Sequence, residues 1–118
     1  MANYRNLVVW QRARVLVKQI YLFTHTFPKS EVFGLSSQMQ RAAVSVLSNI
    51  AEGYGRQSDK ELVHFLRIAK GSLFELESQL YVAVDLEYVT EEKIAETLDL
   101  CDEISRMLAK LSYVVVHR

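Results

Sequence analysis

The sequence contains few residues that can cross-link the chain or interrupt a helix: one cysteine, one proline and four glycines among 118 residues. A lone cysteine, Cys101, excludes an intramolecular disulfide and a zinc site built from cysteines, and it favours a reducing compartment. No run of 18 or more apolar residues occurs without a charge, and Gln11, Arg12 and Arg14 interrupt the apolar stretch near the start. These absences exclude a membrane-spanning helix and a signal peptide, so we expect a soluble cytoplasmic protein.

The chain also has no excess of either charge, because 14 Lys and Arg balance 14 Asp and Glu. The balance conceals a division, since residues 1–70 hold ten Lys/Arg and four Asp/Glu (+6), and residues 71–118 hold four and ten (−6). With 50% apolar and 24% charged residues, the composition suits one packed core and excludes a disordered chain. We therefore expect a single domain over residues 1–118.

The few breakers fall between segments with helical periodicity, which predicts an all-α protein. Two pairs, Ser37 with Gln40 and Ser58 with Glu61, have the form of a capping box and mark two helix starts, and Thr90 suits a third N-cap. The predicted helices span about residues 7–26, 37–53, 59–88 and 91–115. Because the connections are short, we expect an up-down-up-down antiparallel four-helix bundle.

The first and third helices carry more apolar residues than the core of a monomeric bundle requires. The surplus residues form rows beside the core stripes: Phe65, Ile68, Val82 and Leu86 on the third helix, and Val8, Trp10 and Val17 on the first. A wide core stripe is the simpler explanation. Exposed apolar patches of this size are unusual in monomers, however, so we expect part of this surface to be buried in a homo-oligomer.

The sequence carries no convincing catalytic or metal site. Glu61 and His64 have the Glu-x-x-His form of di-iron bundles, but no second copy of the motif occurs and both residues flank the apolar stripe. The three histidines lie in different segments, and Cys101 lies on an apolar stripe, where a buried unreactive thiol is expected. We expect neither an enzyme nor a cofactor.

The second helix bears a polar row beside its apolar face, formed by Arg41, Ser45, Asn49 and Glu52. Because nearby alanines permit close packing, these polar groups must be hydrogen-bonded, and we expect a structural network that includes an Arg41–Glu75 pair. A binding site is the alternative for this row.

Basic residues occupy outward positions on the first and third helices. Positive charge on a rigid face attracts nucleic-acid phosphates without reading base sequence. A solvated helix surface is the plainer explanation for any one of these residues. The segment from Arg56 to Lys60 opens the third helix, where free N–H groups could also bind an anion, although an ordinary capped turn is the default.

One stretch, from Leu35 to Gly53 (LSSQMQRAAVSVLSNIAEG), resembles the signature of the bacterial 23S rRNA intervening-sequence proteins. That family is related to the accessory variability protein of diversity-generating retroelements. The resemblance extends to LVVWQ at 7–11, FP at 27–28, FGL at 33–35 and IAKGSLFELE at 68–77. Leu47 departs from the pattern, because relatives often have proline there.

The resemblance implies a four-helix bundle that assembles as a barrel-like homopentamer and associates with RNA or another nucleic acid. No catalytic residues carry over. Together with the basic half of the chain, it favours a non-enzymatic nucleic-acid-binding oligomer. The candidate contacts are Arg14, Lys18, Arg56, Lys60, Arg67 and Lys70. A protein-interaction scaffold is the alternative, with its partner on the acidic fourth helix or at the mouth of the oligomer. A metalloenzyme is the third hypothesis.

Overall fold

The computed structural model describes residues 3–118, and within this range all regular secondary structure is helical. The elements are η1 (Tyr4–Asn6), α1 (Val8–His25), η2 (Lys29–Glu31), α2 (Leu35–Tyr54), α3 (Asp59–Asp85) and α4 (Glu91–Val116). The prediction of four helices without strands is confirmed, and the predicted bounds agree to within about three residues.

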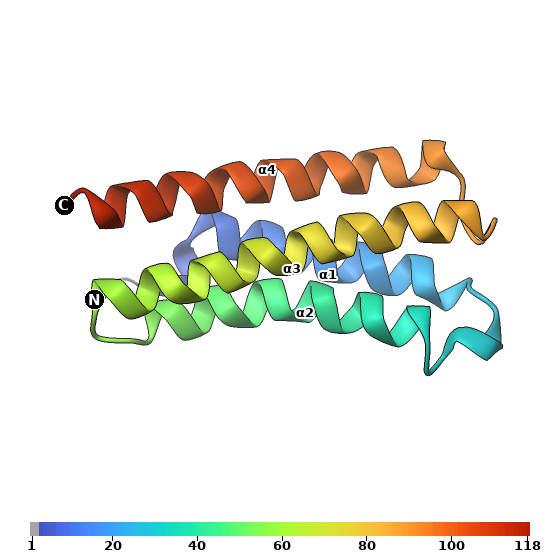
Figure 1. The fold of residues 1–118 in the computed structure, drawn as a ribbon, viewed down its shortest axis with the longest axis horizontal. Helices are drawn as coiled ribbons and strands as arrows, with labels where there is room; N and C mark the ends of the chain where they lie inside the picture. Colours follow the sequence, from blue (N-terminus) through green and yellow to red (C-terminus); the bar gives the residue numbers. More distant parts are fainter. Residues whose placement is uncertain (1–2) are drawn as a thin grey trace.

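The four helices lie side by side, and each runs antiparallel to the next (Figure 1). Helix α1 packs against α2 and α4, and α3 packs against the same two helices, so the bundle is closed. The molecule measures 46 × 24 × 20 Å. The α2–α3 turn, η1 and the end of α4 therefore lie at one end of the long axis, and the α1–α2 and α3–α4 connections lie at the other (Figure 1).

The core follows the apolar stripes that the sequence shows. On α3 every residue of the 4, 3, 4, 3 series is buried, and the equivalent series on the other helices are mostly buried. The α3 series comprises Leu62, Leu66, Ala69, Leu73, Leu76, Leu80 and Ala83. At about 25 cal/mol per Å² of apolar surface, burial of this continuous seam is the main force that holds α3 between its neighbours.

The surplus apolar rows are only partly covered by the chain itself. Ile68, Val82 and Leu86 on α3 and Val8 on α1 are exposed. The remaining members of the predicted rows, Phe65, Trp10 and Val17, are half-buried. Phe74 and Tyr81 extend the exposed row on α3. The outward face of this helix is therefore unusually apolar.

Helices α2 and α3 approach each other closely because small residues line their contact. The hydroxyl groups of Ser45 and Ser72 are 2.9 Å apart. A Cβ atom placed on Gly53 would lie only 3.0 Å from Phe65 Cβ and 3.1 Å from Leu62 Cδ1. Glycine is thus favoured near the end of α2, because a side chain there would push α3 away by a few tenths of an ångström.

Helices α1 and α4 are joined by polar contacts as well as by the core. The Arg12 Nε donates to Glu103 Oε2 at 2.9 Å. The Thr97 hydroxyl, which is buried, donates to Gln19 Oε1 at 2.7 Å. These contacts satisfy polar groups that would otherwise be costly at a helix interface.

The predicted start of α2 is wrong by two residues. The helix begins at Leu35, so Ser37 lies within the first turn, and Gln40 donates to the Thr24 hydroxyl on α1 instead of completing a capping box. The N-terminal N–H group of Leu35 is satisfied by the Glu31 side chain. The helix then runs unbroken through Leu47, the position that departs from the family pattern.

The other two helix starts follow the sequence signals. The Ser58 hydroxyl accepts the N–H of Glu61 at 3.1 Å, and the Thr90 hydroxyl accepts the N–H of Lys93 at 3.2 Å. Each hydroxyl satisfies one of the free N–H groups in a first helical turn. Both N-cap predictions are confirmed.

Helix α3 ends three residues earlier than predicted, because the chain adopts a left-handed conformation at Glu87 (φ 64°). The N–H groups of Glu87 and Tyr88 bond to the carbonyls of Val84 and Ala83, the pattern of a Schellman motif. Glycine is the usual residue at this position. The absence of glycine explains why the sequence did not signal the end of the helix.

We expect Glu87→Gly to raise the free energy of unfolding by up to about 1 kcal/mol, because the left-handed conformation is strained for every residue with a Cβ atom. Urea denaturation of both proteins measures the change. A decrease in stability would show that the Glu87 side chain contributes a contact worth more than the backbone strain.

Glu31 holds two connections together at the end of the bundle far from η1. Its Oε1 accepts the Leu35 N–H at 3.0 Å, and its Oε2 accepts the Tyr88 hydroxyl at 2.7 Å. The Tyr88 ring also packs against Phe27, with ring centroids 5.2 Å apart. The Tyr88 hydroxyl and then the Leu35 N–H lower the pKa of Glu31 from its usual value of 4.5. The ionised carboxylate is thus the form that the fold favours.

Because the folded pKa of Glu31 is lowered, its contribution to stability is complete above pH 4.5 and is lost as the pH falls through the lowered value. We expect Glu31→Gln to lower the melting temperature at pH 7, and the difference from the unmodified protein to shrink at pH 3. Glu96→Gln is the control, because this exposed residue lies beyond the first turn of α4 and has no hydrogen bond or ion pair to a described side chain. A difference for Glu31→Gln that is equal at both pH values would contradict this account.

Candidate nucleic-acid interface

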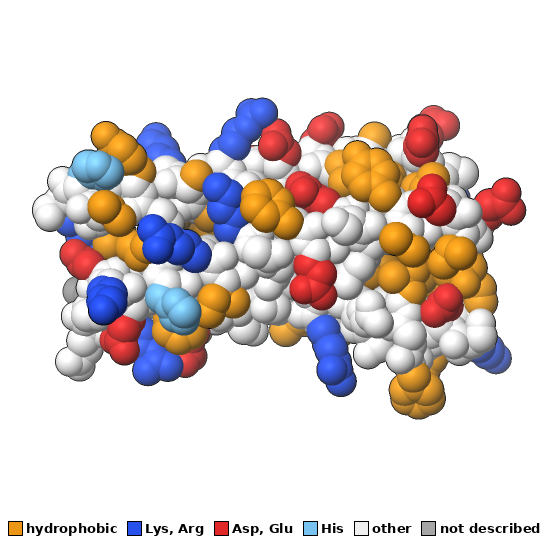
Figure 2. All heavy atoms as spheres, in the orientation of Figure 1, with side chains coloured by type: hydrophobic (Ala, Val, Ile, Leu, Met, Phe, Trp, Pro, Cys, Tyr) orange, Lys and Arg blue, Asp and Glu red, His pale blue; other side chains and the backbone are white. Residues whose placement is uncertain are grey.

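The charges of the molecule separate along its long axis (Figure 2). When each helix is divided at its midpoint, the half with the α2–α3 turn comprises residues 3–16, 45–72 and 104–118. It holds ten of the 14 Lys/Arg and three of the 14 Asp/Glu, a net charge of +7, and we call it the basic half. The acidic half, residues 17–44 and 73–103, holds four and 11, a net charge of −7.

This axial division differs from the division along the sequence, because the chain reverses direction at every turn. The end of α4 returns to the basic half and brings Arg106, Lys110 and Arg118 with it. Conversely, the acidic second half of α3 packs in the acidic half beside the start of α4. The fold therefore produces a stronger separation of charge than the sequence order alone.

Five of the six predicted contact residues lie in the basic half: Arg14, Arg56, Lys60, Arg67 and Lys70. Lys18 lies just beyond the midpoint of α1, in the acidic half. All are exposed except Lys70, which is half-buried with its Nζ 5.9 Å from the centre of the Phe74 ring. Arg14, Lys60 and Arg67 form no ion pair with a described carboxylate, so their charge is available to a ligand.

Aromatic rings position two arginines near the start of the chain. The rings of Tyr4 and Trp10 meet edge to face, with centroids 5.3 Å apart. The guanidinium carbon of Arg5 lies 5.2 Å from the Tyr4 ring, and that of Arg14 lies 5.3 Å from the Trp10 ring. Cation–π contacts of this kind orient a guanidinium group without neutralising it. Both groups thus keep their donors for an anion.

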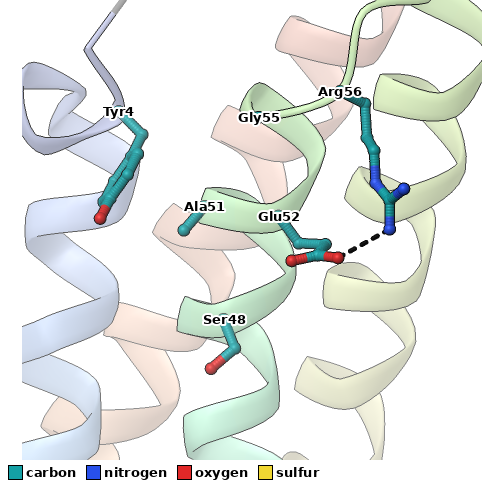
Figure 3. Close-up of a pocket in the computed structure, with 6 residues that line it drawn as sticks. All are labelled: Tyr4, Ser48, Ala51, Glu52, Gly55 and Arg56. Carbon is teal, nitrogen blue, oxygen red and sulfur yellow. Dashed lines mark hydrogen bonds and ion pairs between the residues drawn. The ribbon is translucent and has the colours of Figure 1, made fainter.

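A shallow hollow of about 570 Å³ lies beside this cluster (Figure 3). Tyr4 forms one side, the small residues Ala51 on α2 and Gly55 just after the helix line the hollow, and Glu52 and Arg56 lie on the other side. Arg56 donates to Glu52 Oε1 at 2.7 Å and lies 5.0 Å from the centre of the Phe65 ring. Arg56 is consequently partly neutralised, unlike Arg14.

The start of α3 does not offer the open anion site that its sequence suggested. Asp59 and Glu61 put two carboxylates in the first turn, and the Ser58 hydroxyl already caps it. Arg118 donates two hydrogen bonds to Asp59, at 2.7 and 3.3 Å, and these bonds lower the pKa of Asp59. The turn is an ordinary capped turn, and Lys60 beside it remains exposed.

The polar row on α2 divides into separate contacts. Asn49 Nδ2 donates to both the carbonyl and the hydroxyl of Ser45, and that hydroxyl contacts Ser72 on α3. The suggested Arg41–Glu75 pair is wrong, because Glu75 accepts from Gln79 within α3 and Arg41 forms no ion pair in residues 3–118. Both residues are exposed, so neither needs a partner within the protein.

Sequence reasoning missed basic residues that the fold adds to this half. Arg5 and Lys110 are exposed and form no ion pair with a described carboxylate. Lys110 is on α4, where carboxylates outnumber basic residues, so only its distance from the start of that helix indicates which end of the bundle it occupies. In an antiparallel bundle that distance places it beside the start of α1, where Leu7, Val8 and Met107 share a small apolar hollow with it.

Metal and membrane sites receive no support from the geometry. Glu61 and His64 are exposed on the outer face of α3. Over residues 3–118, no group of three or more His, Cys, Asp or Glu side chains is arranged to hold a metal ion. None of the helices in this range has the length and apolar character needed to cross a bilayer.

Cys101 is buried on α4, and burial followed by the nearby Glu77 carboxylate raises its pKa to about 12. Because the thiolate is the reactive form, we expect the native protein to react very slowly with a thiol-specific disulfide reagent at pH 8. The reaction should become rapid in denaturant. A fast reaction of the native protein at one thiol per chain would contradict the burial of this group.

Comparison with known proteins agrees with this fold. The model of the family described as 23S rRNA-intervening sequence protein matches residues 5–110. The chain belongs to the 23S rRNA-intervening sequence protein family. A solved structure from the S23 ribosomal protein family of Bacteroides thetaiotaomicron VPI-5482, a protein described as having unknown function, is 25% identical. It covers 89% of this chain and 98% of its own, with a TM-score of 0.81. No curated protein matches the chain.

The family match covers most of the basic half. The matched region includes Arg14, the α2–α3 turn and α4 as far as Lys110, and it stops before Arg118. The relatives establish the fold, and the function must be argued from the charges and contacts of this chain.

Proposed function

We propose that this protein is a non-enzymatic, oligomeric RNA-binding protein that holds the phosphates of a structured RNA against its basic half. The observation that carries the proposal is the net charge of +7 in one half of a bundle whose total charge is zero. Clustered Lys and Arg bind nucleic acid mainly by releasing counterions from phosphates, which requires charge but little base recognition.

The basic half also has the local features that phosphate binding requires. Arg14, Lys60 and Arg67 are exposed and have no carboxylate partner among the described residues. The Trp10 ring orients Arg14, which reduces the entropy that its guanidinium group loses on binding. Rigid helices carry all three residues. The proposal includes no catalytic step and no cofactor, and it locates the protein in the cytoplasm.

Self-association forms part of the proposal, and the family resemblance suggests five copies. The exposed Ile68, Phe74 and Tyr81 on α3 support it, because a monomer would leave this row in water. In a ring of parallel copies, every basic half would face the same side and the positive patch would be multiplied. Sedimentation velocity at micromolar concentration tests this part, and a monomer would refute it.

Salt dependence tests RNA binding most simply. We expect the affinity for a fluorescently labelled RNA hairpin to fall about 1,000-fold between 50 and 200 mM salt if about six phosphates are neutralised. Fluorescence anisotropy at several salt concentrations gives the slope. Absence of binding at 50 mM salt, or an affinity that changes less than about threefold, would overturn the proposal.

A further inference from the structure

The acidic end of the bundle carries apolar side chains that no other part of residues 3–118 covers. Phe33, in the connection before α2, is 97% exposed, and its neighbour Val32 is 53% exposed. Leu22 in the last turns of α1 and Leu86 after α3 are 62% and 48% exposed. Figure 2 shows orange and red side chains together at this end. We call these four residues the apolar end patch.

The two connections that carry most of this patch are held to each other. Glu31 binds both the first N–H of α2 and the Tyr88 hydroxyl, so the segment with Val32 and Phe33 is tied to the connection that follows Leu86. An aromatic side chain presented by a restrained connection loses little entropy when it is buried by a partner. The patch therefore has the properties of a preorganised contact surface.

The charges around the patch determine which partner it fits. In the two connections and the adjoining turns, residues 22–34 and 85–96, six carboxylates outnumber two lysines: Glu31, Asp85, Glu87, Glu91, Glu92 and Glu96 against Lys29 and Lys93. Nucleic acid and another acidic surface would be repelled here. A protein segment with apolar side chains flanked by Lys and Arg would be attracted.

We propose that the apolar end patch is a docking site for a cationic amphipathic segment of another protein, with Phe33 as the central apolar contact. This inference goes beyond RNA binding, because it concerns the opposite end of the molecule and a different class of partner. A chain that binds both would link an RNA at its basic half to a basic protein at its acidic half.

The test uses a synthetic 14-residue helical peptide of leucine and lysine, with leucines at i, i+3, i+4 and i+7 positions, and a matched peptide with glutamate in place of lysine. We expect fluorescence anisotropy to detect micromolar binding of the lysine peptide only. Phe33→Ser should weaken this binding at least tenfold, since a central aromatic residue carries much of the binding energy of an interface. The double variant Glu91→Gln with Glu92→Gln should weaken it and reduce its salt dependence.

Val114→Ser is the matched control, because Val114 is exposed on α4 in the basic half. It should leave peptide affinity unchanged, and Phe33→Ser should leave both circular dichroism and RNA affinity unchanged. The inference would be overturned if the lysine peptide did not bind, or if Phe33→Ser did not change its affinity. Neither result would affect the RNA proposal. A smaller sedimenting species for Phe33→Ser would also overturn it, because the patch would then be a contact between copies of this chain.

Discussion

RNA affinity is expected to fall about 1,000-fold when three exposed charges of the basic half are reversed together, by Arg14→Glu, Lys60→Glu and Arg67→Glu. A hydrogen bond to a charged group contributes about 1.5–3 kcal/mol. Even at the lower value, the loss of three contacts amounts to about 4.5 kcal/mol, or three factors of ten. Anisotropy titrations of the same RNA hairpin at 100 mM salt measure this effect, and the salt slope should decrease in parallel.

A second triple variant separates local contacts from the effect of total charge. Lys29→Glu, Arg41→Glu and Lys93→Glu change the net charge by the same amount, and all three residues are exposed in the acidic half. We expect this protein to bind RNA within about threefold of the unmodified protein. Equal losses in the two triple variants would mean that only the total charge matters and that the basic half is not the RNA site.

Gly53→Ala is expected to lower the free energy of unfolding by about 1–3 kcal/mol, the usual effect of overpacking. The new methyl group would lie 3.0 Å from Phe65 Cβ, an atom fixed to the α3 backbone, so the two helix backbones would have to shift apart locally by a few tenths of an ångström. The higher helix propensity of alanine offsets only part of this loss. Urea denaturation, with helicity monitored by circular dichroism, measures the change.

Gly71→Ala is the matched control for this prediction. Gly71 is exposed in the middle of α3, and a Cβ atom there would have no neighbour within 4 Å. The same substitution is therefore expected to raise the free energy of unfolding, by about 0.5–1 kcal/mol. We therefore predict that the free energy of unfolding falls for Gly53→Ala and rises for Gly71→Ala. If both variants gained stability, the close approach of α2 and α3 would not be a constraint on the fold.

Much of the fold was predictable because apolar periodicity directly reports which face of a helix is buried. The series from Leu62 to Ala83 is entirely buried, as its spacing indicated. Local signals worked where the capping group is adjacent in sequence, as at Ser58 and Thr90. They failed at Ser37, because the first N–H of α2 is satisfied by Glu31 from the preceding connection. They failed again at Glu87, where a residue other than glycine adopts the left-handed conformation.

The candidate site was predictable only in part, since it depends on how the helices are arranged. The outward positions of Arg14, Lys60 and Arg67 follow from helical spacing, and all three are exposed. The contribution of Lys110 follows only from the antiparallel path that returns α4 to the basic half. Of the apolar end patch only Leu86 was signalled by the sequence, because Phe33 lies outside any periodic segment.

Ultraviolet cross-linking of the protein to a bound RNA hairpin, followed by mass spectrometry of the cross-linked peptides, tests the central claim most directly. The claim is that the axial separation of charge creates an RNA-binding half. The account predicts cross-links within residues 3–16, 45–72 and 104–118. The account would be contradicted if the cross-links were concentrated within residues 17–44 and 73–103. It would also be contradicted if a stable RNA complex persisted in the triple variant of Arg14, Lys60 and Arg67.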